Sequence, residues 1–438
     1  MRISYYNIGC KVNFAEISQI RKQFELLGHE TVEFGQITDA VIINTCSVTN
    51  MADSDCRKII RRALRYSPDA FIGVLGCYAQ LKPEDIAKID GVDAVFGIKE
   101  KFSIPDIISD FRKKGKAQLL VSNLEDLPFH TACSVDNESH TRMVLKLQDG
   151  CDYSCTYCTI PNARGGSRSM PFGELKSKII ELNETDYYEI ILSGINLGEY
   201  KAPTEERFID VIKFIENSGV KQRFRISSIE PNLITPELIE IVKNSKTVCP
   251  HFHIPLQSGS PEILKLMRRR YDAESFRELI IYIKEKIPDC CIGVDVISGF
   301  PGETGKHFEE TFNLLESLPV SYLHPFTFSE RDNTPAATFP GIVPHDIRKS
   351  RTVELRKLSD TKKALFYNSQ VGTVRTAIPE QFDKENGAWK GWTENYVHVE
   401  FSGVDLPQVQ PNSGKKPLKL ELVECSGDFV RGRVLSVR

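Results

Sequence analysis

The sequence predicts an α/β protein built from three parts. These are an N-terminal parallel α/β domain (residues 1–125), a central partial (βα)6 barrel (141–365) and a small antiparallel β-barrel (368–438). Three observations predict this arrangement. Strand-like and helix-like runs alternate along two stretches of the chain, the segment between these stretches is aperiodic, and polar and apolar residues alternate near the end.

In the first part, four runs rich in Ile, Val and Phe are expected to be buried strands, separated by helices. The strands are RISYYNIGC, DAVIINTCSV, FIGVLGCYA and DAVFGI, and the helices are NFAEISQIRKQFELLG, ADSDCRKIIRRALRYS and PEDIAKIDG. Gly28 is placed to cap the first helix. This alternation predicts a parallel sheet with helices on both faces. Residues 112–140 show neither the helical nor the strand-like apolar periodicity and are expected to be a linker. Cys133 lies in this linker and has no assigned role.

Three cysteines occupy equivalent places in this first part. Cys10, Cys46 and Cys77 each stand at the carboxyl end of a predicted strand. The carboxyl ends of parallel strands lie along one edge of a sheet, so these thiols can be close in space. Three thiolates there would make a metal site with three protein ligands. For any one of them alone, a buried small hydrophobic residue is the alternative interpretation.

Six further strand-like runs extend from Met143 to about Ser329. They are MVLKLQD, YEIILSGINL, RFRISSI, HFHIPLQ, IGVDVISGF and YLHPFTFS. With the helical runs between them, they predict half to three-quarters of a TIM-like barrel, with its site at the carboxyl ends of the strands. A basic helical segment follows (347–370). The runs VGTVRTAI, NYVHVEF, LKLELVEC and FVRGRVLSV then predict a small antiparallel barrel or sandwich.

A second group of cysteines follows the first barrel strand. In LQDGCDYSCTYCTIP, Cys151, Cys155 and Cys158 have the spacing C-x3-C-x2-C, and the aromatic Tyr157 precedes the last of them. Four thiolates would close a structural zinc site or an electron-transfer cluster, whereas three leave one coordination position open for chemistry. The alternatives are a redox Cys-x-x-Cys pair, a zinc knuckle without its fourth ligand, and a chance triple of buried cysteines.

Small and polar residues end the later barrel strands. Gly194 ends the second strand, where glycine lets a backbone approach a ligand closely. The next two strands end in polar side chains that could hydrogen-bond a ribose or an amino group, namely Ser228, Glu230, Gln257 and Ser258. Helix capping by the serines is the alternative. The fifth strand ends in DVISGFPGET, where Ile297, Gly299 and Pro301 would shape a turn around an aromatic base.

The charge and composition of the chain limit which classes of protein it can belong to. The net charge of −3 gives no global case for nucleic-acid binding, but residues 57–65 and 331–363 are locally basic. A solvated helix face is the alternative for each stretch. No run approaches the roughly 18 apolar residues that would cross a membrane, and the start of the chain shows no secretory signal. Twelve cysteines are too few for a secreted disulfide scaffold, so a cytoplasmic, reducing location is expected.

These strings together resemble the methylthiotransferases of the radical S-adenosylmethionine (SAM) superfamily, over essentially the full length. The resemblance is carried by GCKVN, NTCSVTNMAD, GCYAQ, GCDYSCTYCTIP, ARGGSRS, HFHIPLQSGSPEILKLMRRRY, DVISGFPGET and SERDNTPAA. The C-terminal VGTVRTAI and GWTENYVHV resemble the RNA-binding TRAM barrel, although this chain reads AIPEQF where many relatives have a VLFE-like string. GCKVN and NTCSVT are most similar to the branch that acts on N6-threonylcarbamoyladenosine in tRNA. Other branches act on isopentenyladenosine in tRNA or on an aspartate of a ribosomal protein.

The resemblance implies two 4Fe–4S clusters and bound SAM. Cys151, Cys155 and Cys158 would hold the cluster that binds SAM, and Cys10, Cys46 and Cys77 would hold an auxiliary cluster where the transferred sulfur binds. Tyr157, Gly194, Ser228, Glu230, Gln257, Ser258, Ile297, Gly299 and Pro301 would contact SAM, and Asn13 and Arg331 would lie on the substrate side. A radical formed from SAM would remove hydrogen from carbon 2 of an adenine.

The implied partners are the anticodon stem-loop of a tRNA and an electron donor such as flavodoxin or ferredoxin, with no membrane. The TRAM barrel and the basic residues 331–363 would hold the tRNA, because phosphate contacts position such a substrate and the pocket specifies it. A non-catalytic iron–sulfur protein that binds RNA is the alternative from another class.

Overall fold

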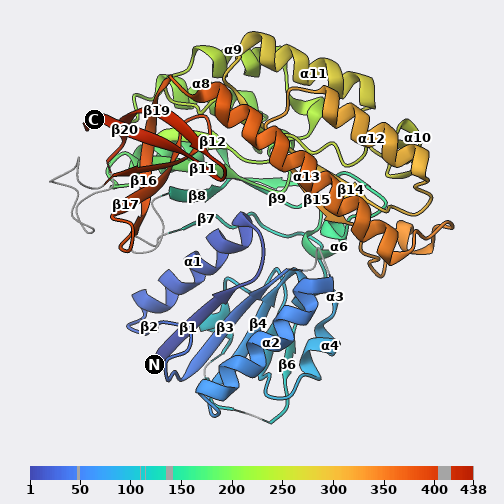
Figure 1. Ribbon diagram of the computed structural model, residues 1–438. Helices are drawn as coiled ribbons and strands as arrows, with labels where there is room; N and C mark the ends of the chain where they lie inside the picture. The colour runs from blue at the N-terminus through green and yellow to red at the C-terminus, as the bar shows by residue number, and fades with distance from the viewer. Residues whose placement is uncertain (47–49, 109, 114, 135–141, 403–415, 438) are drawn as a thin grey trace.

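The computed structural model describes residues 1–46, 50–108, 110–113, 115–134, 142–402 and 416–437 (Figure 1). It contains a parallel sheet near the N-terminus, a partial barrel of parallel strands in the middle and a closed barrel at the C-terminal end. The predicted fold class is confirmed. Within the described ranges, no helix combines the length and the apolar character that crossing a membrane requires.

The N-terminal sheet has six parallel strands in the order β2-β1-β3-β4-β5-β6. They are β1 (Arg2–Asn7), β2 (Glu30–Val32), β3 (Ala40–Thr45), β4 (Phe71–Gly76), β5 (Ala94–Phe96) and β6 (Gln118–Leu120). One buried cluster joins the sheet to helix α1 (Lys11–Leu26), and another joins the opposite face to α2 (Asn50–Tyr66), α3 (Cys77–Leu81) and α4 (Pro83–Ala87). The short helix α5 (Ile104–Ile107) follows β5.

The central barrel has six parallel strands in chain order, each followed by helical structure. The strands are β8 (Arg142–Lys146), β11 (Glu189–Ser193), β12 (Arg223–Ile226), β13 (His251–His253), β14 (Cys291–Ser298) and β15 (Tyr322–Thr327). An isolated bridge between Phe224 and Val248 continues the wall between β12 and β13. The helices are α7 (Phe172–Leu182), α8 (Phe208–Asn217), α9 (Pro236–Asn244), α10 (Pro261–Leu266), α11 (Ala273–Lys286), α12 (Gly305–Ser317) and the long α13 (His345–Gln370).

Short elements complete the barrel. β9 (Gln148–Asp149) pairs with β10 (Arg168–Ser169), and helix α6 (Ile160–Arg164) lies between them in sequence. Single 3-10 turns cover Leu197–Glu199, Pro231–Leu233 and Pro335–Thr338.

The predicted linker is partly structured. β6 lies inside residues 112–140, and so does the two-residue strand β7 (Ala132–Cys133), which pairs antiparallel with β8. Cys133 is buried in the barrel core, which explains an apolar residue in a polar stretch. The sequence carried no periodic signal here because both strands are only two or three residues long.

Helix α1 lies between the N-terminal sheet and the barrel (Figure 1). The cluster that contains Ile17 and Phe24 of α1 also contains Val144 of β8 and Ile191 of β11. One apolar core therefore runs across the boundary between the first two parts, and this core holds the carboxyl edge of the first sheet against the barrel.

The C-terminal barrel is closed, with strand order β16-β17-β18-β20-β19. The strands are β16 (Val374–Asp383), β17 (Ala388–Thr393), β18 (His398–Ser402), β19 (Leu418–Ser426) and β20 (Phe429–Val437). The string AIPEQF lies in β16, whose pairing with β17 is shifted between Pro379 and Gln381. Since proline has no amide hydrogen to donate, a bulge at this point keeps the remaining ladder intact.

Candidate metal and cofactor sites

Cys10, Cys46 and Cys77 follow three neighbouring strands of the N-terminal sheet. Cys10 lies between β1 and α1, Cys46 follows β3, and Cys77 opens α3 directly after β4. Because β1, β3 and β4 are adjacent and parallel, the three thiols share the carboxyl edge of the sheet. A Cβ added to Gly9 would lie 3.0 Å from the Cβ of Cys46, so the loop before Cys10 passes directly beside Cys46.

The second group of cysteines lies on the loop between β9 and α6. Gly150 starts this loop with φ of +71°, and a Cβ there would lie 2.0 Å from the carbonyl oxygen of Gly166. Only glycine fits at that point. The amide of Tyr153 donates to Sγ of Cys151 at 3.4 Å, which fixes the first thiol of the loop.

The two groups of cysteines are close to each other. Helix α3, which begins at Cys77, contacts α6, which begins two residues after Cys158. Tyr78 and Thr159, the residues next to these two cysteines, line a common cavity of about 250 Å³ together with Arg331. The structure therefore places the carboxyl edge of the first sheet opposite the cysteine loop of the barrel.

Burial affects the thiols of both groups. It raises the pKa of Cys151, Cys155, Cys158 and Cys77, so these thiols stay protonated until a metal replaces the proton. Three thiols in each group would leave a metal centre with an open coordination position.

Arg269 joins the cysteine loop to the barrel. Its guanidinium donates to Sγ of Cys155 at 3.1 Å and to the hydroxyl of Tyr157 at 3.2 Å, and it forms an ion pair with Glu230. The sequence did not assign a role to Arg269, although it stands in the string MRRRY. Through this ion pair Glu230, one of the predicted SAM contacts, belongs to the same hydrogen-bonded chain.

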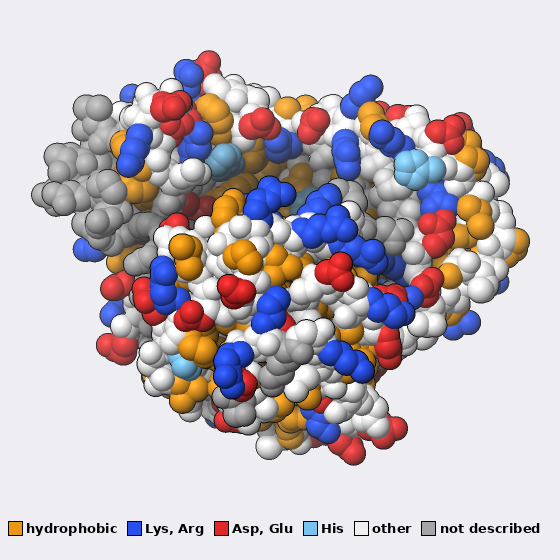
Figure 2. All heavy atoms as spheres, turned by 90° about the horizontal axis from the view of Figure 1, so that it is seen from below, with side chains coloured by type: hydrophobic (Ala, Val, Ile, Leu, Met, Phe, Trp, Pro, Cys, Tyr) orange, Lys and Arg blue, Asp and Glu red, His pale blue; other side chains and the backbone are white. Residues whose placement is uncertain are grey.

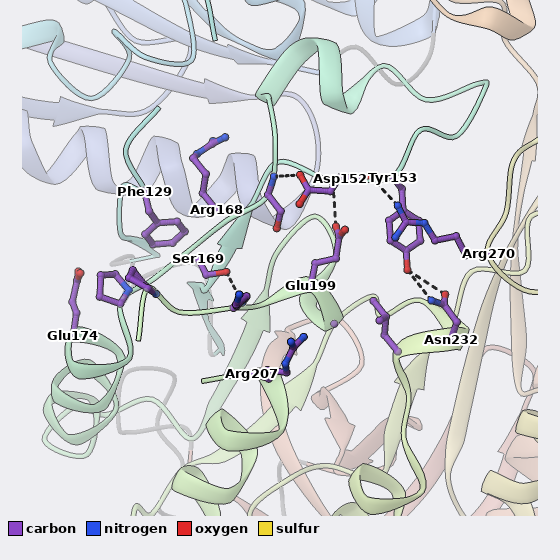
Figure 3. Close-up of a pocket in the computed structure, with 16 residues that line it drawn as sticks. Phe129, Asp152, Tyr153, Arg168, Ser169, Glu174, Glu199, Arg207, Asn232 and Arg270 are labelled. Atoms are coloured by element: carbon purple, nitrogen blue, oxygen red, sulfur yellow. Dashed lines mark hydrogen bonds between the residues drawn. The ribbon is translucent and has the colours of Figure 1, made fainter. Parts of the chain in front are cut away.

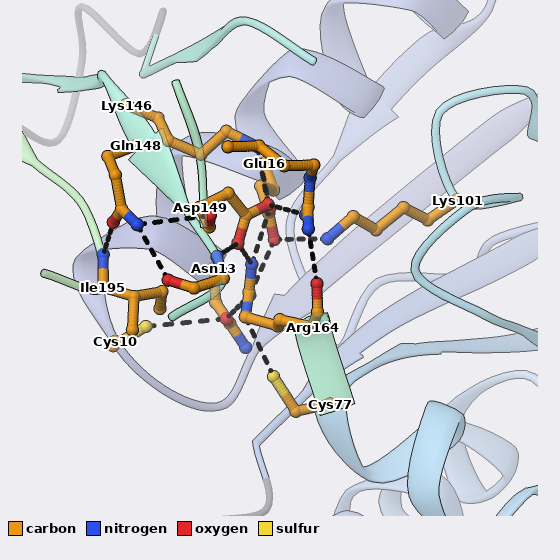
Figure 4. A network of polar contacts seen from close by, with 12 residues as sticks. Cys10, Asn13, Glu16, Cys77, Lys101, Lys146, Gln148, Asp149, Arg164 and Ile195 are labelled. Atoms are coloured by element: carbon orange, nitrogen blue, oxygen red, sulfur yellow. Dashed lines mark hydrogen bonds and ion pairs between the residues drawn. The ribbon is translucent and has the colours of Figure 1, made fainter. Parts of the chain in front are cut away.

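A buried ionic network lies where the two groups of cysteines meet (Figure 4). Arg164 is at its centre and is fully buried. Its guanidinium donates to Sγ of Cys77 at 3.2 Å, to Asp149 at 2.8 Å and to both oxygens of Glu16 at 3.0 Å. Asn13 accepts from the same guanidinium at 2.7 Å. We call Glu16, Lys101, Lys146, Asp149 and Arg164 the Arg164 network.

The charges of the Arg164 network do not cancel. Lys101 contacts Glu16 at 2.7 Å, and Lys146 contacts Glu16 and Asp149 at 3.1 and 3.3 Å. Arg168 also contacts Asp149, at 3.2 Å, so four cations face two carboxylates and the network carries excess positive charge. Burial alone would lower the pKa of Arg164, but its interactions with the sulfur of Cys77 and with the carboxylates of Glu16 and Asp149 raise that pKa well above its usual value. An anionic ligand sulfur at Cys77 would offset part of the excess positive charge.

A cavity of about 240 Å³ brings five of the predicted site residues together. Tyr157, Cys158, Gln257, Ile297 and Arg331 all line it. Gln257 has φ of +67°, and its backbone N–H donates to the backbone carbonyl oxygen of Asp295 at 2.9 Å. This cavity lies next to the cysteine loop and is lined by both apolar and polar side chains, as sites for small molecules are.

Other predicted residues have structural partners. A Cβ on Gly194 would lie 3.0 Å from the side chain of Gln148, and Ser258 is buried with its hydroxyl 3.3 Å from that of Thr311. Gly299 has φ of +78° and packs on Arg348, Pro301 is buried in the turn that follows, Ser228 bridges to His253, and Asn13 is buried in contact with Arg164. The described residues that line the 240 Å³ cavity do not include these six.

A larger polar cavity of about 660 Å³ lies beside the cysteine loop (Figure 3). Arg270 stacks over the ring of Tyr153 at 3.8 Å, and the hydroxyl of Tyr153 meets Asn232. The carboxylate of Asp152 accepts from the amide of Ser167 at 2.8 Å. These contacts hold the outer side of the loop in place.

Basic side chains gather on one face of the molecule (Figure 2). Arg57, Arg61 and Arg65 of α2, with Lys88, line a surface cavity of about 610 Å³. Arg57 also lines the 250 Å³ cavity that contains Arg331. The basic stretch 57–65 therefore faces the entrance between the first sheet and the barrel.

Comparison with known proteins shows which protein families the chain is similar to. A profile of the radical SAM superfamily matches residues 145–315, and one described as "Uncharacterized protein family UPF0004" matches residues 2–97. In solved structures, the radical SAM methyltransferase TsrM of Kitasatospora setae, with cobalamin and a 4Fe–4S cluster bound, aligns with a TM-score of 0.56 at 14% identity, over 77% of each chain. This likeness establishes a common fold.

Curated relatives are similar over nearly the whole chain. The threonylcarbamoyladenosine tRNA methylthiotransferase MtaB of Bacillus subtilis is 38% identical over 98% of this chain and 96% of its own, and that of Thermotoga maritima is 34% identical over 97% of each. A tRNA-2-methylthio-N(6)-dimethylallyladenosine synthase of Clostridium tetani is 29% identical over 90% and 89%. With this similarity along its length and both groups of cysteines in place, the chain belongs to the methylthiotransferase family of radical SAM enzymes.

Proposed function

We propose that this protein is a tRNA methylthiotransferase that converts N6-threonylcarbamoyladenosine at position 37, 3′ of the anticodon, to its 2-methylthio derivative. One observation carries the choice of substrate. The relatives named for threonylcarbamoyladenosine reach 38% identity, whereas those named for dimethylallyladenosine reach 30% at similar coverage. The two alternatives within the family are isopentenyladenosine in tRNA and a ribosomal-protein aspartate.

Two 4Fe–4S clusters and SAM are the cofactors. Cys151, Cys155 and Cys158 would hold one cluster, and Cys10, Cys46 and Cys77 the other. When bound, they supply the one-electron cleavage of SAM and the sulfur that replaces hydrogen on carbon 2 of the adenine. The thiols fit this role because each group offers three of them, and because Arg164 donates to Sγ of Cys77 within a network that carries excess positive charge.

The side chains of the protein hold and orient these groups. Arg269 would fix Cys155 and Tyr157, while Gln257 and Ile297 would line the SAM side of the 240 Å³ cavity. Arg331, in the wall between the cavities, would face the substrate. Gly194, Ser228, Glu230, Ser258, Gly299 and Pro301 would also contact SAM, and Asn13 would lie on the substrate side, as the family resemblance implies.

Each of the three predicted domains would have its own role in the reaction. Residues 1–125 would carry the auxiliary cluster, 141–365 the SAM chemistry, and 368–438 the grip on RNA. Basic residues of α2 and of 331–363 would contact the phosphates of the anticodon stem. An acidic one-electron donor such as flavodoxin or ferredoxin would act in the same reducing cytoplasm.

Two measurements test the proposal. Anaerobic reconstitution should give about eight irons per chain and reductive cleavage of SAM, and failure to cleave SAM with both clusters assembled would leave the non-catalytic RNA-binding alternative. Mass spectrometry of tRNA nucleosides from a deletion strain should then show loss of 2-methylthio-threonylcarbamoyladenosine, restored by the wild-type gene. Loss of the isopentenyl derivative in its place would assign the other tRNA branch.

A further inference from the structure

The Arg164 network reaches two of the three thiols of the N-terminal group (Figure 4). Arg164 donates to Sγ of Cys77 at 3.2 Å and to Oδ1 of Asn13 at 2.7 Å. The same oxygen of Asn13 lies 3.6 Å from Sγ of Cys10. Arg164, Asn13 and Cys77 are all buried. The guanidinium is thus in direct contact with one proposed cluster ligand and is joined to a second through one side chain.

Water is excluded from the charges behind this contact. The five side chains of the Arg164 network have at most 4% of their surface exposed. Arg168, which contacts Asp149, is more exposed, and with it four cations face two carboxylates. Buried charges are screened much less than charges in water, so their field extends further. A field of positive sign therefore acts on Sγ of Cys77.

The cysteine loop of the barrel meets a different balance of charge. Arg269 donates to Sγ of Cys155 at 3.1 Å, so one thiol of this group also accepts a hydrogen bond from an arginine. The guanidinium of Arg269 is paired with the carboxylate of Glu230, however, and this pair is neutral as a unit. The two groups of thiols are therefore alike in their hydrogen bond from an arginine and differ in the excess charge behind it.

We infer, on the basis of the proposed auxiliary cluster, that the Arg164 network raises the reduction potential of this cluster above that of the cluster on the cysteine loop. A four-iron cluster becomes more negative when it takes up one electron. Positive charge and hydrogen bonds to the ligand sulfurs stabilise the more negative state, and both therefore raise the potential. Arg164 supplies the hydrogen bond, and Lys101 and Lys146 supply further charge. They would act as positioning residues, through the sulfur ligands of the cluster, and the auxiliary cluster would be the first of the two to be reduced.

Two forms of the full chain, each with one cluster, allow the potentials to be measured separately. The form that should hold only the auxiliary cluster carries Cys151→Ala, Cys155→Ala and Cys158→Ala. The form that should hold only the other cluster carries Cys10→Ala, Cys46→Ala and Cys77→Ala. Each should bind about four irons per chain. Both are titrated anaerobically with a viologen as the one-electron reductant, without SAM, and the reduced cluster is followed by electron paramagnetic resonance. The auxiliary cluster should have the higher midpoint potential.

Two substitutions in the form with the auxiliary cluster separate charge from hydrogen bonding. Lys101→Met removes a buried charge whose partner is Glu16. The potential should fall by at least about 59 mV, which is a tenfold change in the equilibrium constant for one electron. Arg164→Lys keeps the charge but not the planar fork of donors, so it should lower the potential by weakening the hydrogen bond to Cys77. Lys362→Met, at a buried lysine of α13 that donates to a backbone carbonyl, is the matched control and should leave the potential unchanged.

The outcomes distinguish this inference from the proposed function. An unchanged potential in Lys101→Met, with about four irons loaded, would overturn the inference, and so would an auxiliary cluster with the lower midpoint potential of the two. If Arg164→Lys binds no iron, Lys101→Met alone decides. A form without the loop cysteines that takes up no iron would instead refute the auxiliary cluster and the proposed function with it. The choice between tRNA substrates does not enter, because no RNA is present in the titration.

Discussion

Arg164 is the residue on which the junction of the two groups of cysteines depends. Its side chain is fully buried and contacts Glu16, Asp149 and Cys77. Arg164→Met would remove the guanidinium that donates to both carboxylates and to Cys77, and removing one partner of such a buried ion pair costs about 3–5 kcal/mol. Urea unfolding of the metal-free protein should show a loss of that order. Arg168→Met removes a more exposed arginine that also contacts Asp149, so it should cost clearly less. Equal losses would contradict the central place of Arg164.

Substitutions in the two groups of cysteines should affect different steps of the reaction. Cys46→Ala should leave about four irons per chain and preserve cleavage of SAM, yet abolish insertion of sulfur. Cys155→Ala should lose both activities, because it removes a ligand of the cluster that binds SAM. Iron analysis, deoxyadenosine release and tRNA nucleoside analysis provide the readouts. Methylthiolation by either variant at the wild-type level would refute the assignment of ligands.

The sequence showed the residue types of the site better than their contacts. All six cysteines were predicted from spacing and strand position, and the structure places them on two adjacent edges. Arg164 and Arg269 were not predicted, although both lie in quoted motifs. Their thiol partners are 87 and 114 residues away in sequence, and no local period encodes such a pairing. His253, Asp295 and His324, whose ligand-type atoms lie within 4.8 Å of one another, were missed for the same reason, because they come from three strands.

At the scale of elements, His251 shows how the central barrel meets the C-terminal barrel. It begins β13, its Nε2 lies 3.2 Å from the hydroxyl of Tyr322, and its ring packs against Tyr396 in a tilted arrangement with ring centroids 4.6 Å apart. Arg225 of β12 donates to the backbone carbonyls of Thr393 and Glu394 beside it. Burial, with Arg225 nearby, keeps the pKa of His251 well below its usual value.

This buried histidine predicts a loss of stability in acid. Unfolded His251 takes up a proton below about pH 6.5, whereas the folded ring stays neutral. The unfolded state then binds more protons, so the free energy of unfolding falls by up to about 1.4 kcal/mol per pH unit below that point. His251→Gln should flatten this slope, and above pH 7 the difference between variant and wild type should be constant. Parallel slopes from pH 5 to 7 would refute the role of His251.

Elements were predictable where they are long and periodic. All six barrel strands and the long helix α13 were expected from their apolar runs and charge pattern. β2, β6 and β7 were missed because they have only two or three residues. β17 was missed although it has six, because Lys390 and Gly391, which are both depleted in strands, stand in its middle. Its place in the sheet is set by pairing with β16 and β18.

At the scale of the whole molecule, the first two parts share a core and an ionic network. Val144 and Ile191 of the barrel pack with α1, and Lys146 and Arg164 of the barrel neutralise Glu16 of α1. A fragment of residues 1–125 would expose this apolar face and leave Glu16 with Lys101 alone. The active geometry, in which both cysteine groups face each other, therefore depends on the joined chain.

The fragment 1–125 should accordingly be much less stable alone than within the full chain. It should melt at a clearly lower temperature by circular dichroism and bind a hydrophobic dye, because the α1 face stays in water. Adding the separately expressed fragment 126–438 should raise the melting temperature and displace the dye, since α1 regains its apolar and ionic partners. Glu16→Gln in the first fragment should weaken this rescue, whereas Glu30→Gln, at an exposed position on β2, should not. A fragment that melts like the full chain without its partner would mean that the shared core contributes little, and that the two cysteine groups are held together by the linker alone.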